Sequence, residues 1–540
     1  MQMESREKFP FKRSLSNFIS YFITILVLLT SLFIIIIYYY RDSNYTVEIL
    51  KPANNSLVSG DFSVELLVMG NADILKIYVD DSLIERRALN IGSESSLVSI
   101  QKILVISKGL TEKKHLIKAE LNKGLFSVKK VSEVSIDFIK FARDSLPLEN
   151  QTMDKNLEMV LRDLIPDYYV VVDSLRRKYP MVWKYNPIYI SIKNKVLDST
   201  KYVNIRTLFK KLFFAIEENL DDEVYYIAHL INVEFYKHSI PFWISFYNRV
   251  SSNNYRTTFL LSYKIVRTIK VEIPNGEVEV LVITRLDKLN RVERFLGMQV
   301  PETPVPLVIE ERIKEEAESI IDFIKNRQNS LMEFRGLYYF SQPSYNLQLR
   351  QMVRMSLIDV FGRKTSKSLI EEYLTSSTAY HETNHYLNTV TCVQMSVIIQ
   401  DVLNYFVKKQ RNGSNDHFVL KDPARIKNYY YLASLANEEV SSYLFQISHS
   451  KELSKYLLYK MTDYMLKYDY NELGLHWIAK VVLFLIGNEF GFVSGDFLFK
   501  DYPENEAQWL ELSKKIIEQK PVLIVEKAKQ AFLKQFMIAQ

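Results

Sequence analysis

Cysteine and glycine are both scarce in this chain of 540 residues. The single cysteine, Cys392, excludes a disulfide within the chain and any zinc site built from several thiolates. We interpret it as a small core residue rather than a nucleophile. Only 14 glycines occur, and neither the G-x-x-x-x-G-K-[ST] nor the G-x-G-x-x-G pattern is present. Glycine-rich loops that bind nucleotide phosphates are therefore not expected.

A concentrated positive charge is also lacking. The net charge of +6 is spread over the chain, and no basic block follows the first long apolar stretch. We therefore expect no binding to nucleic acid. Hydrophobic residues make up 48 % of the chain and charged residues 24 %, which is typical of folded proteins. A chain of this length exceeds one hydrophobic core, so we expect about two to four domains.

That apolar stretch runs from Phe18 to Tyr40 without a charged residue. As a helix it is long enough to cross a hydrocarbon core of about 30 Å. A cleaved signal peptide is the alternative, but its apolar part usually has only about 7–15 residues and ends in small residues. This stretch ends instead in tyrosines followed by Arg41, and tyrosine suits the membrane interface. We therefore predict an uncleaved transmembrane anchor at residues 18–40.

The cations around this stretch predict its orientation. Those that precede it are Arg6, Lys8, Lys12 and Arg13. Only Arg41 and Lys51 follow closely. By the positive-inside rule, residues 1–17 form a cytoplasmic tail and the bulk of the chain lies outside the cytoplasm. The expected location is the cell membrane, with a single pass and with the lipid bilayer as the partner of residues 18–40.

Residues 45–140 have the pattern of an all-β domain. Short alternating segments are separated by turn residues, at Tyr45–Leu50, Phe62–Val68, Ile74–Val79, Lys114–Leu121, Ser127–Lys130 and Glu133–Phe138. Such spacing predicts a β-sandwich. The I-x-x-P opening (49–52) and the I-Y-V-D-D segment (77–81) resemble the immunoglobulin-like modules of bacterial surface proteins. That resemblance implies a spacer or a docking surface for a surface partner.

After about residue 150 the pattern becomes mainly helical. Residues 150–300 are expected to form an α+β region that contains a β-hairpin, with its turn at Pro274-Asn275-Gly276. The proline-rich segment 301–306 marks the start of residues 301–540, which we predict to be a helical domain.

One motif in that helical domain combines metal-binding and acid–base residues. It is an H-E-x-x-H, formed by His381, Glu382 and His385 in a chain with only eight histidines. On a helix the two histidines lie one turn apart on the same face and can bind one metal ion. Glu382 lies about 100° around that helix, where its carboxylate can accept a proton from water. Residues 370–408 contain neither glycine nor proline, so nothing interrupts a helix there.

A catalytic zinc site needs a third protein ligand. The H-E-x-x-H-x-x-G-x-x-H form is excluded, because Asn388 and Thr391 stand where it needs glycine and histidine. The other form takes a glutamate from a later helix, and the adjacent Glu438 and Glu439 are the candidates. Glu439 lies nearer to an apolar stripe, where an unpaired carboxylate is unfavourable.

The motif and the later Asn437-Glu438 pair together resemble the gluzincins, metallopeptidases whose third zinc ligand is a glutamate that typically follows an asparagine. The resemblance implies Zn2+ as the cofactor. It implies His381, His385 and Glu438 as the zinc ligands, with Glu439 as the rival of Glu438.

The same resemblance implies the catalytic roles. Glu382 would accept a proton from the attacking water and pass it to the leaving amine. His476 is a candidate donor of a hydrogen bond to the oxyanion, with a buried structural role as the alternative. Tyr380 and Tyr443 are further candidates for that donor.

The predicted fold class is therefore multidomain: an N-terminal transmembrane helix, an all-β immunoglobulin-like sandwich and a mainly α (α+β) zincin-like domain. The predicted function is a membrane-anchored zinc metallopeptidase that cleaves a peptide or protein substrate outside the cytoplasm. One alternative is a non-catalytic adhesion or scaffold protein with a peptidase-like fold, although a binding role does not need Glu382. The other is a chance motif on a structural helix.

Overall fold

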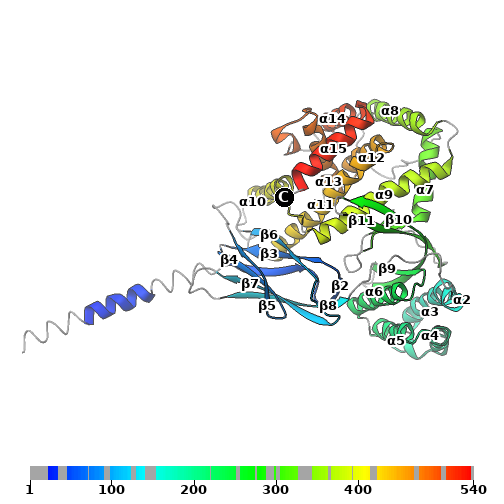
Figure 1. Ribbon diagram of the computed structural model, residues 1–540, viewed down its shortest axis with the longest axis horizontal. Coiled ribbons are helices and arrows are strands. Elements are labelled where there is room, and N and C mark those ends of the chain that lie inside the picture. Colours follow the sequence, from blue (N-terminus) through cyan, green and yellow to red (C-terminus); the bar gives the residue numbers. More distant parts are fainter. Residues whose placement is uncertain are drawn as a thin grey trace, which may run out of the picture. The chain divides into compact units, whose positions relative to one another are not determined.

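The computed structural model describes most of the chain, and its helices and strands are labelled in Figure 1. The described residues are 22–33, 45–70, 72–89, 98–122, 129–139, 154–179, 181–218, 220–250, 256–273, 276–287, 297–298, 305–325, 343–362, 366–391, 393–413, 423–467, 474–499 and 506–536. Contacts within the chain divide it into two compact units. One comprises Met1–Ile49, Leu66–Gln101 and Leu116–Val134, and the other comprises Leu50–Glu65, Lys102–His115 and Ser135–Gln540.

The transmembrane anchor predicted at residues 18–40 is not supported. Within the described part of the chain, no helix combines the length and the apolar character needed to cross a membrane. Residues 22–33 are helical. The rest of the predicted span lies outside the described residues, and the predicted fold class is wrong on this point.

Two sheets form the N-terminal β region. Their strands are β1 (Thr46–Lys51), β2 (Ser56–Ser59), β3 (Phe62–Met69), β4 (Ile74–Val79), β5 (Ser82–Ala88), β6 (Val98–Val105), β7 (Lys114–Asn122) and β8 (Lys130–Ile139). One sheet has the order β1-β3-β6 and the other the order β2-β8-β7-β4-β5. Every second residue of β4 is buried, at Leu75, Ile77 and Val79. The sheets are therefore sandwich-like, as the alternating pattern predicted.

A helical layer follows, made of α2 (Lys155–Met159), a π-helical turn (Val160–Leu164), α3 (Ile165–Lys178), a 3-10 turn (Trp183–Tyr185), α4 (Pro187–Ser199), α5 (Val203–Glu217) and α6 (Asp221–Lys237). Aromatic side chains fill its core, where the rings of Tyr168 and Phe213 lie 4.8 Å apart. The side chain of Asn232 on α6 makes two hydrogen bonds with the backbone of Ile244, which fix α6 to the next sheet.

That sheet contains β9 (Phe242–Val250), β10 (Arg256–Ile273), β11 (Gly276–Arg285), β12 (Gly297–Met298) and β13 (Leu307–Ile309), in the order β12-β13-β11-β10-β9. The expected hairpin is present, since β10 and β11 pair antiparallel up to Ile273 and Gly276. Pro274 and Asn275 of its turn lie outside the described residues. Among the described strands, β12 is at one edge of the sheet and pairs only with β13.

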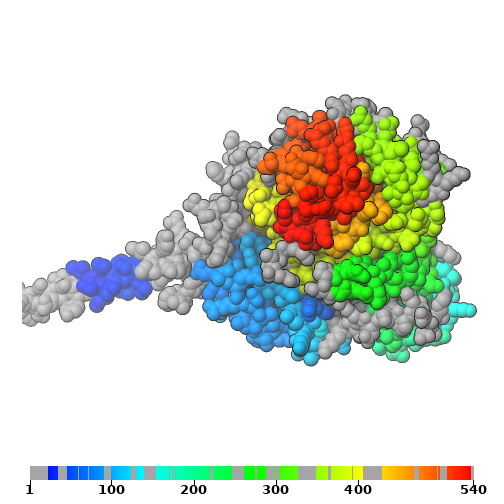
Figure 2. All heavy atoms as spheres, turned by 45° about the horizontal axis from the view of Figure 1, so that its top comes forward, coloured from blue at the N-terminus to red at the C-terminus, as the bar shows by residue number. Residues whose placement is uncertain are grey.

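The remainder of the described chain is helical. Its helices are α7 (Glu310–Ile324), α8 (Pro343–Phe361), α9 (Lys367–Val390), α10 (Val397–Gly413), α11 (Pro423–His449), α12 (Ser454–Lys467), α13 (Leu475–Glu489), a 3-10 turn (Gly495–Phe499), α14 (Glu506–Glu518) and α15 (Pro521–Phe536). The apolar α13 is buried along its length. A Cβ at its Gly487 would stand 2.7 Å from a methyl of Leu512, so α13 and α14 pack closely. Figure 2 shows α14 and α15, in orange and red, at the molecular surface.

Candidate metal centre

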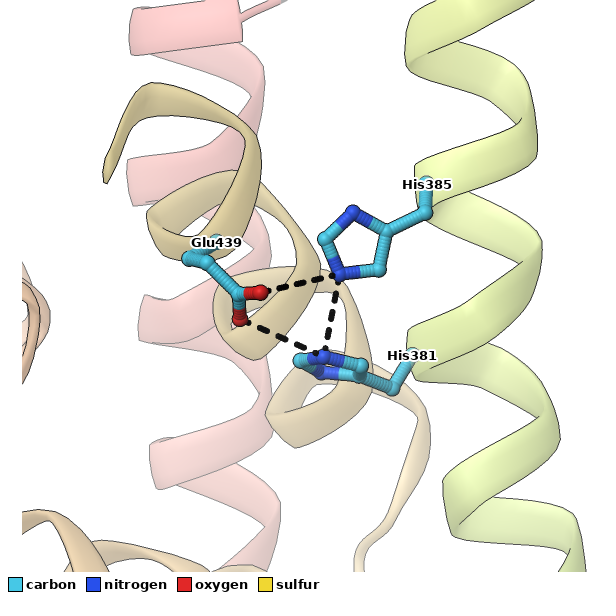
Figure 3. Close-up of side chains that lie close together, drawn as sticks. All are labelled: His381, His385 and Glu439. Carbon is cyan, nitrogen blue, oxygen red and sulfur yellow. Dashed lines mark hydrogen bonds and ion pairs between the residues drawn. The ribbon is translucent and has the colours of Figure 1, made fainter. Parts of the chain in front are cut away.

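The H-E-x-x-H motif lies in the second half of α9, as the sequence predicted, but the helix ends at Val390 and the next begins at Val397, so the segment 370–408 is not one helix throughout. The helix begins after Ser366, whose backbone is extended. His381 and His385 are one turn apart and both project toward α11 (Figure 3). Helical spacing therefore brings the two imidazoles together without any help from loops.

Three side chains meet where α9 passes α11. The Nε2 atoms of His381 and His385 lie 3.2 Å apart. From α11, one carboxylate oxygen of Glu439 lies 3.5 Å from Nε2 of His381, and the other lies 3.6 Å from Nε2 of His385. Figure 3 shows the carboxylate facing both rings. Within the described residues, these three side chains form the cluster of histidine and carboxylate groups that can hold a metal ion.

The spacing of these donor atoms fits zinc. A tetrahedral zinc ion has bonds of about 2.0–2.1 Å to histidine nitrogen and carboxylate oxygen, so its ligand atoms are about 3.3–3.4 Å apart. The observed separations of 3.2, 3.5 and 3.6 Å are close to that value. Two imidazoles and one carboxylate also leave a fourth position for water or substrate, as in catalytic zinc sites.

Glu438, the preferred third ligand, does not lie with the histidines. Its carboxylate accepts a hydrogen bond of 2.8 Å from Nζ of Lys51 and lies 3.5 Å from Nζ of Lys102. Consecutive residues of a helix point about 100° apart, and here the carboxylate of Glu439 is the one that faces the histidines. The geometry favours the rival, Glu439. The preference for Glu438 came from the Asn-Glu order of the gluzincins, and this chain departs from that order.

The two glutamates differ in their electrostatic surroundings. Burial would raise the pKa of Glu438, but the ammonium groups of Lys51 and Lys102 outweigh burial and lower the pKa to about 2. Burial would also raise the pKa of Glu439, and its hydrogen bond with His381 and the charge of His385 lower it instead. Both carboxylates are therefore ionised at neutral pH, but only Glu439 is directed to a metal site.

The two histidines are unequal. Burial lowers the pKa of His385 to about 4, against the opposing effect of Glu439. Burial acts in the same direction on His381, but the hydrogen bond and charge of Glu439, followed by the charge of Glu382, raise its pKa overall. A metal ion binds imidazole through an unprotonated nitrogen. His385 is therefore already in the metal-binding form at neutral pH.

Glu382 is buried, with 6 % of its surface exposed. Its side chain lies against β12, because a Cβ at Gly297 would be 2.8 Å from one of its carboxylate oxygens. Burial raises the pKa of Glu382 to about 8, and the charge of Glu439 adds to the rise. The charge of His381 opposes it. Glu382 is thus enclosed between α9 and the described edge of the sheet, beside the histidines.

Polar side chains hold α9 against α11. The amide nitrogen of Asn384 donates to the hydroxyls of Ser441 and Ser442, at 2.9 and 3.2 Å. The amide of Asn388 donates to the same Ser441 at 2.8 Å. Small hydroxyl side chains let the helices approach closely. A sequence signal did exist, since Asn384 and Asn388 repeat at helical spacing beside the histidines.

The candidate donors to an oxyanion fall in different places. The ring of Tyr443 lies 4.6 Å from the ring of His381, at the cluster. Tyr380 instead stacks on His449, with ring centroids 4.8 Å apart. His476 is buried on α13, and its Nδ1 hydrogen-bonds with the carbonyl oxygen of Met465.

His476 has the properties of a buried structural histidine. Burial lowers its pKa to about 4, and the charge of Lys480 adds to this. Within the described residues, the cluster able to hold a metal ion does not include it. The geometry therefore favours the structural alternative for His476 over a catalytic role.

Comparisons with known proteins leave the family open. No protein-family model matches the chain, and no curated protein matches it. The likeness to the gluzincins therefore stays a prediction from the sequence motif. A solved structure of fibronectin(III)-like modules of CbhA from Clostridium thermocellum is similar at 12 % identity, covering 18 % of this chain and 100 % of that chain, with a TM-score of 0.14.

Proposed function

We propose that this protein is a zinc-dependent peptide hydrolase of the gluzincin type, with His381, His385 and Glu439 as the zinc ligands. The observation that carries the proposal is the arrangement of their donor atoms, with separations of 3.2, 3.5 and 3.6 Å across two packed helices. Those separations match a tetrahedral ion, and the donor set leaves one position open.

Glu382 supplies the acid–base chemistry of the proposal. When bound, zinc would make a water molecule more acidic and would polarise the carbonyl of the substrate. With its pKa raised to about 8, Glu382 is largely protonated in the metal-free chain, and the positive charge of a bound zinc ion would favour its ionised form. In that form Glu382 would accept the proton of the attacking water and pass it to the leaving amine. Its burial keeps bulk water away from that proton transfer. The adjacent carboxylate of Glu439 is engaged with the histidines, so Glu382 is the carboxylate that remains for this role.

The sheet supports a peptide as the substrate class. Among the described strands, β12 lies at an edge and its Gly297 contacts Glu382. The outer side of an edge strand presents backbone groups that can pair with an extended peptide. A peptide added there would lie beside Glu382. We therefore propose that the scissile bond belongs to a peptide in extended conformation.

A non-catalytic scaffold remains the second candidate in principle, and burial of Glu382 counts against it. A buried carboxylate destabilises a fold unless it is paired. The shifted pKa of about 8 reflects that unfavourable burial. A scaffold has no use for such a side chain beside a metal cluster, whereas a hydrolase needs a carboxylate there.

Metal analysis and peptide hydrolysis test the proposal together. The purified full chain is expected to hold about one zinc ion, and the His385→Ala variant is expected to lose it. Glu382→Gln is expected to keep the zinc but to lose cleavage of a denatured protein substrate. A wild-type chain without zinc at neutral pH would overturn the proposal. Full activity of Glu382→Gln would remove the general-base role.

The resemblance of residues 45–140 to immunoglobulin-like modules in particular, and not only to a β-sandwich in general, stays a prediction. It accounts for the alternating strands in both sheets of that region.

A further inference from the structure

Four charged side chains form a cluster next to the candidate metal site. Nζ of Lys51 lies 2.8 Å from Glu438 and 3.6 Å from Glu65. Nζ of Lys102 lies 3.5 Å from Glu438 and 3.7 Å from Glu65. Each lysine thus contacts both glutamates, and the formal charges of the four groups cancel. Such mutual compensation lets ionised groups stay buried.

Two members of this cluster are almost completely buried. The side chains of Lys102 and Glu65 are 3 % and 2 % exposed. One oxygen of Glu65 is buried without a hydrogen bond to any described residue, so Glu65 depends on the lysines for its stabilisation. Removal of a single partner from such a cluster leaves an uncompensated buried charge. The four charges therefore hold one another in place.

The two lysines and Glu65 come from the three-stranded sheet, and Glu438 comes from α11. Lys51 ends β1, Glu65 is in β3 and Lys102 is in β6. Residues 50–65 and 102–115 belong to the same compact unit as α11. The amide of Gln394 also donates to the backbone carbonyl of Lys102 at 3.2 Å, which ties β6 to the segment that follows α9.

The cluster adjoins the metal ligands. Glu438 precedes Glu439 on α11, and its backbone carbonyl accepts a hydrogen bond of 3.5 Å from Asn388, which is on α9 one turn after Asn384. If Glu438 turned to the histidines, Lys51 and the buried Lys102 would share only Glu65 and would stand beside a dication. Repulsion between like charges at short range disfavours that arrangement.

We propose that Lys51 and Lys102 are positioning residues for the metal centre, because they hold Glu438 away from the histidines and so select Glu439 as the third ligand. The inference rests on the proposed function, since it requires that a metal ion binds at His381 and His385. It assigns part of the three-stranded sheet to the metal site, whereas a spacer would have no part in it.

Replacement of both lysines tests whether they select Glu439 as the third metal ligand. In the otherwise wild-type chain, Glu439→Gln is expected to raise the zinc dissociation constant roughly a hundredfold. In the K51M/K102M background Glu438 is released, and the same Glu439→Gln change is expected to raise the constant by less than about tenfold. Competition with a chromophoric chelator measures both constants. Absorption of the Co2+-loaded chains reports whether a carboxylate still completes the site.

Two further variants separate selection from general packing. Lys51→Arg with Lys102→Arg keeps both charges and is expected to restore the full hundredfold effect of Glu439→Gln. Lys460→Met removes a lysine that pairs with Glu316 at 2.6 Å on other helices, and it is expected to leave that effect unchanged. If K51M/K102M does not fold, Lys51→Met alone is measured, because Lys51 is the more exposed of the two lysines.

The outcomes distinguish the two proposals. A wild-type chain that binds no zinc removes the proposed function and the selection with it. A wild-type chain that binds zinc, but in which Glu439→Gln has the same effect with and without the lysines, overturns the selection alone. Loss of the site in Glu438→Gln rather than in Glu439→Gln would also overturn it.

Discussion

Gly297 of β12 lies so close to Glu382 of α9 that no larger residue fits at position 297. A Cβ at position 297 would lie 2.7 Å from Cγ of Glu382 and 2.6 Å from the backbone oxygen of Leu307. Atoms at such distances overlap, so a side chain there must displace either the strand or the glutamate. The position of the proposed general base therefore depends on a glycine that lies 85 residues earlier in the sequence, at 297 against 382.

We expect Gly297→Ala to reduce peptide hydrolysis by about ten- to hundredfold, because a shift of Glu382 by a fraction of an ångström misplaces the proton acceptor. Overpacking is also expected to destabilise the fold by roughly 1–3 kcal/mol. Zinc content should stay at the wild-type level, because the ligands come from α9 and α11. Steady-state kinetics, metal analysis and thermal unfolding of the same preparation check the three effects. Wild-type kcat in Gly297→Ala would show that Glu382 does not act from this position.

The contact between α9 and α11 gives a second prediction. Asn384→Ala removes the hydrogen bonds to Ser441 and Ser442 and leaves buried hydroxyls without that donor. We expect the free energy of unfolding to fall by about 1–3 kcal/mol. Zinc affinity is expected to fall roughly tenfold, because Glu439 is held opposite the histidines by this helix pair.

Thr391→Ala is the matched control for Asn384→Ala. The hydroxyl of Thr391 is exposed and, among the described residues, hydrogen-bonds within its own helix end, to the carbonyl of Leu387 at 2.7 Å. Urea unfolding and chelator competition measure stability and affinity for both variants. An Asn384→Ala chain that loses stability but binds zinc as tightly as the Thr391→Ala chain would separate helix packing from metal binding.

The sequence alone predicted that the two histidines come together. It did not predict which glutamate faces them, because residues far away in the chain surround the two glutamates. His381, Glu382 and His385 share one helix, so their spacing alone predicts that the imidazoles converge. Glu438 and Glu439 are neighbours with equal chemistry. Glu438 is paired with Lys51, which is 387 residues away along the chain, and we propose that this pairing leaves Glu439 for the histidines. No local pattern carries that information.

The transmembrane anchor was a wrong prediction, whereas the role of His476 stays a prediction. The role of His476 depends on what surrounds it, and the structure places it against the carbonyl of Met465. The apolar segment 18–40 has the length of a membrane span in sequence, but among the described residues no helix is long and apolar enough to cross a membrane. The sandwich-like sheets and the long helices, in contrast, follow from residue alternation and from the absence of helix-breaking residues.

A third prediction concerns the stability of the fold at acidic pH. Burial lowers the pKa of His229 on α6 to about 4, against an ordinary value of 6.5. Because the unfolded chain takes up the proton first, stability is complete above about pH 6.5 and falls as the pH approaches 4. A shift of this size corresponds to roughly 2–4 kcal/mol over that range.

Replacement of His229 by phenylalanine is therefore expected to flatten the acid side of the stability profile. His238, at the end of the same helix and 43 % exposed, serves as the control for the same substitution. Urea midpoints between pH 7 and pH 4.5 measure the slope for each chain. If His229→Phe loses stability with acid as steeply as His238→Phe, buried His229 is not a source of the acid sensitivity.

The last prediction assigns the hydrogen-bond donor in the transition state. Tyr443 follows Glu439 by one turn of α11, and its ring lies 4.6 Å from that of His381. Tyr443→Phe removes a hydroxyl and keeps the ring, so the packing against His381 is retained. We expect kcat to fall by about a hundredfold with KM little changed, because an oxyanion donor acts on the transition state and not on the bound substrate.

Tyr380→Phe is the matched control, because Tyr380 adjoins His381 in the sequence but stacks on His449 instead. Its hydrolysis is expected to match that of the wild-type chain. Zinc content is measured in both variants, so that loss of metal is not mistaken for loss of the donor. Equal kcat values for the two variants would exclude Tyr443 as the donor. A parallel rise in KM for Tyr443→Phe would place its hydroxyl in substrate binding, since an interaction made equally with substrate and transition state changes KM and not kcat.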